Sequence, residues 1–141
     1  MFNNEITPTK GCFTVLGEPI AKGAVKVAVV RGFAHKYMPK KTRDGMNDIR
    51  GQLVKILPAN WKPIDGALAL DVVFFRTKPK SAGKKVLYPI TRPDCENYLK
   101  LLNDCFNGIL FKDDSLVVRV TMEKAFATGV AQIQVKYEVL K

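Results

Sequence analysis

The sequence contains few of the residues on which common hydrolytic and zinc sites depend. Its 141 residues include one histidine, His35, and two serines, Ser81 and Ser115. A single histidine excludes zinc sites that need two or more histidines, and this composition disfavours a Ser-His-Asp triad. We expect His35 to occupy an ordinary position on a strand. No Walker motif is found, so no nucleotide cofactor is expected.

Cysteines and long apolar runs are also scarce. The three cysteines, Cys12, Cys95 and Cys105, form no Cys-x-x-Cys pair and leave an odd one over. This pattern is typical of a reducing compartment. The longest strongly apolar run, residues 67–75, is interrupted by Asp71 and is too short to span a bilayer. Because the N-terminus also lacks a signal-peptide pattern, we expect a cytoplasmic protein with no membrane partner.

Acidic residues are few and unevenly distributed. The chain carries 23 Lys+Arg against 13 Asp+Glu, a formal net charge of +10. Residues 76–92 hold six basic side chains and no acidic one, whereas residues 93–114 hold five acidic against two basic. Phosphodiester cleavage requires this arrangement, because cations neutralise the flanking phosphates and carboxylates recruit metal to one phosphate. A solvated basic surface is the alternative, and it accounts less well for the dense run at 76–85.

The pattern of apolar residues predicts one α+β domain over residues 1–141, with residues 1–10 as a loose tail. Apolar alternation and turn signals predict strands, including a hairpin around Arg31-Gly32, at 12–16, 25–30, 32–37, 66–76, 115–124 and 130–139. Three- and four-residue spacing predicts helices at 42–56 and 94–107. We expect a mixed β-sheet with both α-helices packed on one face.

The acidic residues gather around the second predicted helix. Asp94 is a natural N-cap, and Glu96 lies in the first turn with Lys100 four residues later. Asp113-Asp114 follows after a short segment that can return the chain to the same end of the fold. Each residue alone could be only a cap, an exposed ion pair or a turn. Together they predict a divalent-metal site, because clustered like charges need a compensating cation and carboxylates hold magnesium.

Motifs around this helix carry a resemblance to a known family. They are Arg-Pro-Asp-x-Glu-Asn-x-x-Lys from residue 92, Asn-Asp-Cys-Phe-Asn-Gly from 103 and Lys-Asp-Asp-Ser-Leu-Val-Val from 112. In order and spacing they resemble the signature of the RusA family of Holliday-junction resolvases, which are found largely in prophages. Segments that begin at Gly17 and Tyr37 resemble two further family segments. The family usually has aspartate where this chain has Glu96, and glutamate still ligates magnesium.

The resemblance implies a RusA-like fold, an intertwined homodimer and a four-way DNA junction as the substrate. We expect Asp94, Glu96 and Asp114 to hold Mg²⁺, with Mn²⁺ as a substitute and Asp113 as a further ligand or supporting residue. Lys100 would stabilise the charge that builds on the phosphate oxygens or the leaving oxygen. A symmetric dimer suits a junction because the junction presents two equivalent strands for cutting.

Basic residues outside the acidic cluster are predicted to hold the junction arms through phosphate contacts. These residues are Lys22, Lys26, Lys40, Lys41, Arg76, Lys78, Lys80, Lys84 and Lys85. Two other classes of function stay open at this point. A protein that binds branched DNA without cutting it would be indifferent to magnesium. A nuclease for another nucleic-acid substrate, such as flaps or RNA, would differ in substrate preference.

Overall fold

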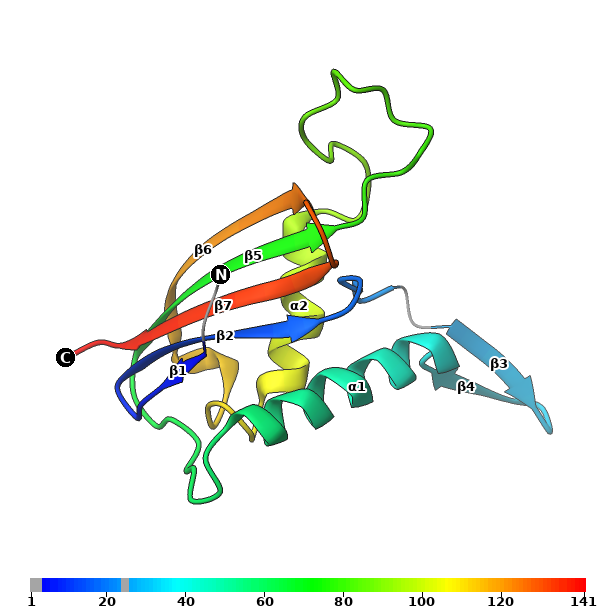
Figure 1. Ribbon diagram of the computed structural model, residues 1–141. Helices are drawn as coiled ribbons and strands as arrows, with labels where there is room; N and C mark the ends of the chain where they lie inside the picture. Colours follow the sequence, from blue (N-terminus) through cyan, green and yellow to red (C-terminus); the bar gives the residue numbers. More distant parts are fainter. Residues whose placement is uncertain (1–3, 24–25) are drawn as a thin grey trace.

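A five-stranded mixed sheet forms the centre of the fold in the computed structural model, which describes residues 4–23 and 26–141 and, of Lys26, only the backbone (Figure 1). In spatial order the strands are β1 (Glu5–Ile6), β2 (Lys10–Leu16), β7 (Gln132–Val139), β5 (Leu68–Arg76) and β6 (Val117–Phe126). Strands β5 and β6 are parallel, and the other neighbours are antiparallel. The sheet is therefore mixed, as predicted.

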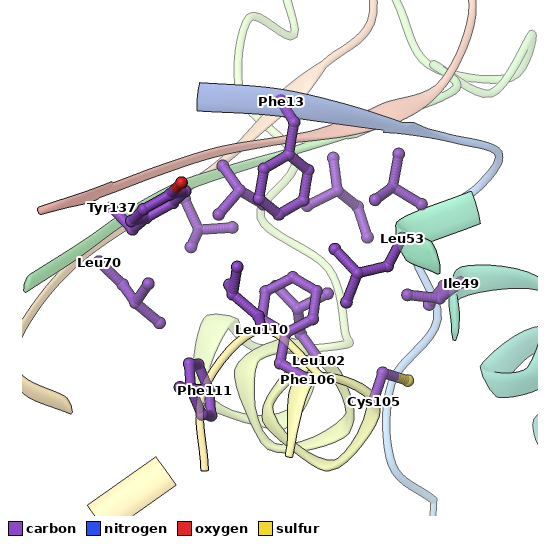
Figure 2. Close-up of a cluster of buried hydrophobic side chains, with 14 of the residues drawn as sticks. Phe13, Ile49, Leu53, Leu70, Leu102, Cys105, Phe106, Leu110, Phe111 and Tyr137 are labelled. Atoms are coloured by element: carbon purple, nitrogen blue, oxygen red, sulfur yellow. The ribbon is translucent and has the colours of Figure 1, made fainter. Parts of the chain in front are cut away.

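Two helices, α1 (Lys40–Ile56) and α2 (Cys95–Phe106), pack on one face of this sheet. Figure 2 shows Phe13 and Leu70 of the strands facing Leu53 of α1 and Phe106 of α2 in a single core. The rings of Phe13 and Phe106 lie 5.9 Å apart in an edge-to-face arrangement. The predicted α+β architecture, with both helices on one face, is confirmed. In the described part of the chain, neither helix is long and apolar enough to cross a membrane.

The helices begin and end at the residues that their sequences favour. Asp94 caps α2, because its side chain accepts a hydrogen bond from the Asn97 backbone N–H at 2.8 Å. At the other end, Gly108 takes a φ of 78°, which other residues rarely adopt. Helix α1 begins two residues before its predicted start, directly after Pro39, whose φ of −54° suits a helix entry.

Residues 1–10 were expected to form a loose tail, and for residues 4–10 this prediction is wrong. Residues 1–3 lie outside the described residues, but Glu5–Ile6 pairs with β2 as the edge strand β1. The Tyr137 hydroxyl donates a hydrogen bond to the Thr7 carbonyl at 2.6 Å. Contacts with a strand at the far end of the chain therefore hold this segment, and the local sequence carries no signal for them.

The predicted hairpin forms a separate two-stranded sheet. Its strands are β3 (Lys26–Val30) and β4 (Phe33–Tyr37), and Figure 1 shows them projecting beyond the N-terminal end of α1. Arg31 and Gly32 make the turn with φ values of 52° and 80°, the backbone that a two-residue hairpin turn requires. Val25, which was predicted to begin the first strand, lies outside the described residues.

Candidate active site

The exposed start of α2 brings together three of the predicted site residues. Asp94 uses its Oδ1 atom to cap the helix, as the prediction for a cap requires. Lys100 Nζ lies 3.4 Å from Glu96 Oε1, and the two side chains remain 57% and 71% exposed. An ion pair this exposed contributes little to stability. Carboxylates at a helix start are favoured by the positive end of the helix dipole.

The second acidic pair stands at the start of β6. Asp113 caps a short 3₁₀ helix, η1 (Asp114–Leu116), and accepts a hydrogen bond from the Ser115 backbone N–H at 3.0 Å. Hydrogen bonds from the Ser115 side chain and backbone lower the pKa of Asp113. Asp113 and Asp114 are both exposed. The Asp113 carboxylate is therefore negatively charged at neutral pH, and both side chains of the pair are accessible to solvent.

The two acidic pairs lie at opposite ends of β6. Lys124, near the end of this strand, donates from Nζ to the carbonyl oxygens of Thr91 at 2.8 Å and Pro93 at 3.0 Å. The end of β6 therefore lies beside the start of α2, whereas Asp113-Asp114 precedes its other end. Val117 pairs with Leu68 and Lys124 with Phe74, six steps along β5, which span about 20 Å at roughly 3.3 Å per residue.

Four carboxylates cannot share one ion across that distance, because magnesium–oxygen bonds are about 2.1 Å long. Among the described residues, no group of three or more His, Cys, Asp or Glu side chains is placed to hold a metal ion. The expectation that residues 109–111 return Asp113-Asp114 to the same end of the fold is wrong. Phe111 instead pairs with Ile64 at the end where α2 finishes, and β6 makes the return.

Lys124 also belongs to this site, although it was not among the predicted site residues. The register of β6 against β5 shifts after Leu68, which pairs with Val117, so that Ala69 pairs with Arg119. Beyond this bulge Lys124 pairs with Phe74, a buried residue of the helix-covered face. Its charge therefore lies next to the first turn of α2. The spacing of Val120, Met122 and Lys124 along the strand was the available signal.

Hydrogen bonds hold the base of loop 77–92 at the end of the sheet where α2 begins. Arg76 donates to the Thr91 carbonyl at 3.0 Å and to the Thr91 hydroxyl at 3.3 Å. Glu18 accepts hydrogen bonds from the Thr77 backbone N–H at 3.2 Å and from the Thr77 hydroxyl. The guanidinium of Arg76, which was predicted to contact DNA, therefore joins the two ends of this loop. Glu18 was missed, although it lies in the family-like segment that begins at Gly17.

Beneath the helix start, Tyr98 packs into the core. Its ring stacks on Phe74 with centroids 5.0 Å apart. Burial raises the pKa of Tyr98, so its hydroxyl stays neutral in the physiological range. This packing fixes the direction in which α2 presents Asp94 and Glu96 to solvent.

Some of the other residues predicted to contact DNA are exposed, and others contact side chains of the protein itself. Exposed lysines extend along the loop and the start of α1; they are Lys40, Lys41, Lys80, Lys84 and Lys85. Lys22 instead pairs with Asp104 at 3.0 Å, and Lys78 lies 5.5 Å from the centre of the Phe126 ring. The Lys26 side chain lies outside the described residues. Figure 1 shows loop 77–92 projecting beyond the end of β5 at the top of the view, whereas the hairpin projects at the lower right.

The sheet carries carboxylates at an exposed helix start beside a lysine-rich loop, an arrangement that suits contact with a phosphate backbone. A family model described as "Endodeoxyribonuclease RusA" matches residues 17–138, so the chain belongs to this family. The chain is also 33% identical over 128 residues to "Uncharacterized protein YqaN" of Bacillus subtilis (strain 168), a match that covers 82% of this chain and 87% of the relative. The family match includes both acidic pairs, the hairpin and the basic loop.

Proposed function

We propose that the protein is a structure-selective endodeoxyribonuclease of the cytoplasm that resolves four-way DNA junctions by paired nicks. The observation that carries this proposal is the exposed start of α2, where Asp94 caps the helix and Glu96 pairs with Lys100, within a chain of the RusA family. The lysines of the adjoining loop 77–92 would neutralise the phosphates on either side of the cut. Lys100 would stabilise the negative charge that develops on the phosphate.

The chemistry of the carboxylates fits magnesium, with manganese as a substitute. Hard oxygen donors suit both ions, and magnesium is usually held by one or two carboxylates together with substrate phosphates. Asp94 with Glu96, or Asp113 with Asp114, would each supply two carboxylates, but one chain does not bring the two pairs together. A bound cation would polarise the scissile phosphate and lower the pKa of a water molecule.

A homodimer would complete the site. Strand β6 lies at the edge of the sheet and exposes apolar side chains, with Val118 62% and Met122 37% exposed. An unpaired strand edge of this kind is a site for association with another chain. A two-fold axis beside the middle of β6 would place the start of one strand next to the end of its copy. Asp113-Asp114 of one protomer would then face Asp94 and Glu96 of the other.

The first experiment tests cleavage. The purified protein is incubated with a synthetic four-way junction or a matched linear duplex, in magnesium or in chelator, beside the Asp94→Asn variant. We expect paired nicks in the junction only, with magnesium only, and none from the variant. Tight junction binding without nicks would instead identify a branched-DNA binding protein. Nicks in linear duplex, flaps or RNA would identify another class of nuclease.

A mixing experiment tests whether the site is shared between protomers. Asp94→Asn and Asp114→Asn chains with different affinity tags are coexpressed, and the mixed dimers are isolated. If each site takes its acids from both chains, a mixed dimer carries one doubly altered site and one intact site. We expect single nicks from the mixed dimers and no nicks from either variant alone. Inactive mixed dimers would exclude the shared site.

A further inference from the structure

The hairpin exposes large apolar side chains that the core does not cover. Within the part of the chain that the structure describes, β3 and β4 pair only with each other. The exposed fractions are 72% for Phe33, 73% for Val29 and 59% for Val27. Exposed apolar surface marks interaction sites, and a two-stranded hairpin is only marginally stable alone in water. A binding partner would therefore stabilise this hairpin.

The strand register divides the hairpin into two different faces. Alternate residues of a strand share a face, so Phe33, His35 and Tyr37 lie in one line along β4. We call this line the aromatic stripe. The register puts Val27 and Val29 of β3 on the opposite face, which is aliphatic. All three residues of the aromatic stripe are exposed.

The spacing of the aromatic stripe matches that of nucleobases. Alternate residues of an antiparallel strand are separated by about 6.8 Å. Bases in a stacked strand are about 3.4 Å apart, so the gap between two successive rings holds one base. Aromatic rings bind unpaired bases in this way with little regard to sequence, because every base has a flat π face.

The charge around the hairpin selects a polyanion as the partner. Residues 19–43 contain seven basic side chains and no acidic one. Arg31 lies at the turn, two residues before Phe33, and Lys36 lies on the opposite face of β4, where the register pairs it with Val27. A second copy of this chain would bring an equally positive hairpin against the first, which repulsion disfavours. Exposed rings on a positively charged hairpin fit a nucleic acid, which presents bases and phosphates together.

We propose that the β3–β4 hairpin is a base-stacking arm whose aromatic stripe takes up unpaired bases beside the branch point of the DNA. This inference rests on the proposed function for its substrate. Bases at a branch point are less firmly stacked than bases within a duplex, so separating them costs less. The arm would thus favour branched over linear DNA, while the carboxylates at α2 act on the backbone.

The test compares the two faces of the hairpin in chelator, where cleavage is blocked. Phe33→Thr/Tyr37→Thr removes two rings from the aromatic stripe, and Val27→Thr/Val29→Thr alters the aliphatic face; threonine preserves the preference for strand in both. The probes are oligothymidylate and a four-way junction with 2-aminopurine beside the branch point. Fluorescence anisotropy reports affinity, and 2-aminopurine emission reports stacking on that base.

We expect the aromatic variant to bind both probes roughly tenfold more weakly for each ring removed. Its 2-aminopurine signal should be lost, while the dependence of affinity on salt stays unchanged because no charge is removed. The aliphatic variant should bind like the unmodified protein. A Phe33→Trp/Tyr37→Trp variant should bind both probes as tightly as the unmodified protein does. That result would show that binding needs an aromatic ring for stacking rather than one specific side chain.

Three results would overturn the proposal. They are an equal loss of affinity from both faces, unchanged binding by the aromatic variant, or a shift in oligomeric state of the free protein when the aromatic stripe is altered. The last result would identify an interface between copies of the chain. If the unmodified protein shows ring-dependent base binding but never cuts junctions, the proposed function fails and the arm stands. If the protein cuts junctions normally but its binding does not depend on the rings, the proposed function stands and the base-stacking arm is refuted.

Discussion

Asp94 has two roles that substitution can separate. Its Oδ1 atom caps α2 through the Asn97 backbone N–H, and its carboxylate is the first predicted metal ligand. Asparagine caps a helix about as well as aspartate, whereas alanine in place of a good cap costs about 1 kcal/mol. For a chain of this length, 1 kcal/mol corresponds to a shift of roughly 3 °C in Tm. Asp94→Asn should therefore melt within about 1 °C of the unmodified protein, and Asp94→Ala about 3 °C lower.

Both variants should fail to nick a four-way junction, because neither retains the carboxylate. Thermal melting followed by circular dichroism gives the two Tm values, and gel electrophoresis of labelled junctions gives the nicking rates. Junction binding in chelator should be unchanged or tighter for Asp94→Asn, since a negative charge near the DNA has been removed. Loss of activity without loss of stability or binding is the expected signature of a ligand.

The matched control is Asp104→Asn, which makes the same charge change on the same helix. Asp104 pairs with Lys22 at 3.0 Å in a partly exposed ion pair, so its loss should cost at most about 1 kcal/mol. This variant should nick junctions normally. Nicking by Asp94→Asn would remove Asp94 from the ligand set. An equal fall in Tm for the Asn and Ala variants would refute the capping argument.

Other variants and solution conditions test the fold and the DNA surface. Gly51→Ala in α1 should raise the free energy of unfolding by roughly 0.5–1 kcal/mol, because the added Cβ meets nothing within 4 Å. Gly11→Ala should lower it by about 1–3 kcal/mol, since its Cβ would lie 2.6 Å from the Glu5 carbonyl oxygen; urea unfolding measures both. Burial raises the pKa of Cys105 to about 11 and that of Tyr137 to about 12. The unfolded chain loses these protons at lower pH, so the urea midpoint should be constant between about pH 6 and 8 and fall between about pH 9 and 11. Junction affinity should fall linearly with salt on logarithmic axes, and a flat titration would contradict the phosphate contacts.

The features that the sequence predicted depend on residues close together in the chain. Asp94 caps α2 by accepting a hydrogen bond from an N–H three residues away, and Arg31-Gly32 turns a hairpin between adjacent strands. Both helices follow from apolar spacing that repeats within one turn or two. The edge strand β1 and the contacts of Lys124 with the residues before α2 escaped prediction because each depends on a distant partner; alternation along β6 gives only the face of the sheet on which Lys124 lies. A local sequence pattern does not show which distant strand will lie beside the segment that carries it.

The separation of the acidic pairs follows from one such distant pairing. Strands β5 and β6 are parallel, and α2 lies between them in the sequence. The helix has to return the chain from the end of β5 to the start of β6, so it runs opposite to both strands. In any such unit the helix begins at the carboxyl ends of the strands and finishes at their amino ends. Asp94 and Glu96 at its start, and Asp113-Asp114 beyond its finish, are therefore at opposite ends of the sheet by topology. An antiparallel β5–β6 pair would have allowed all four acids to meet in one chain. With parallel strands, a site that uses both pairs needs a second copy, and the mixed-dimer experiment tests that requirement.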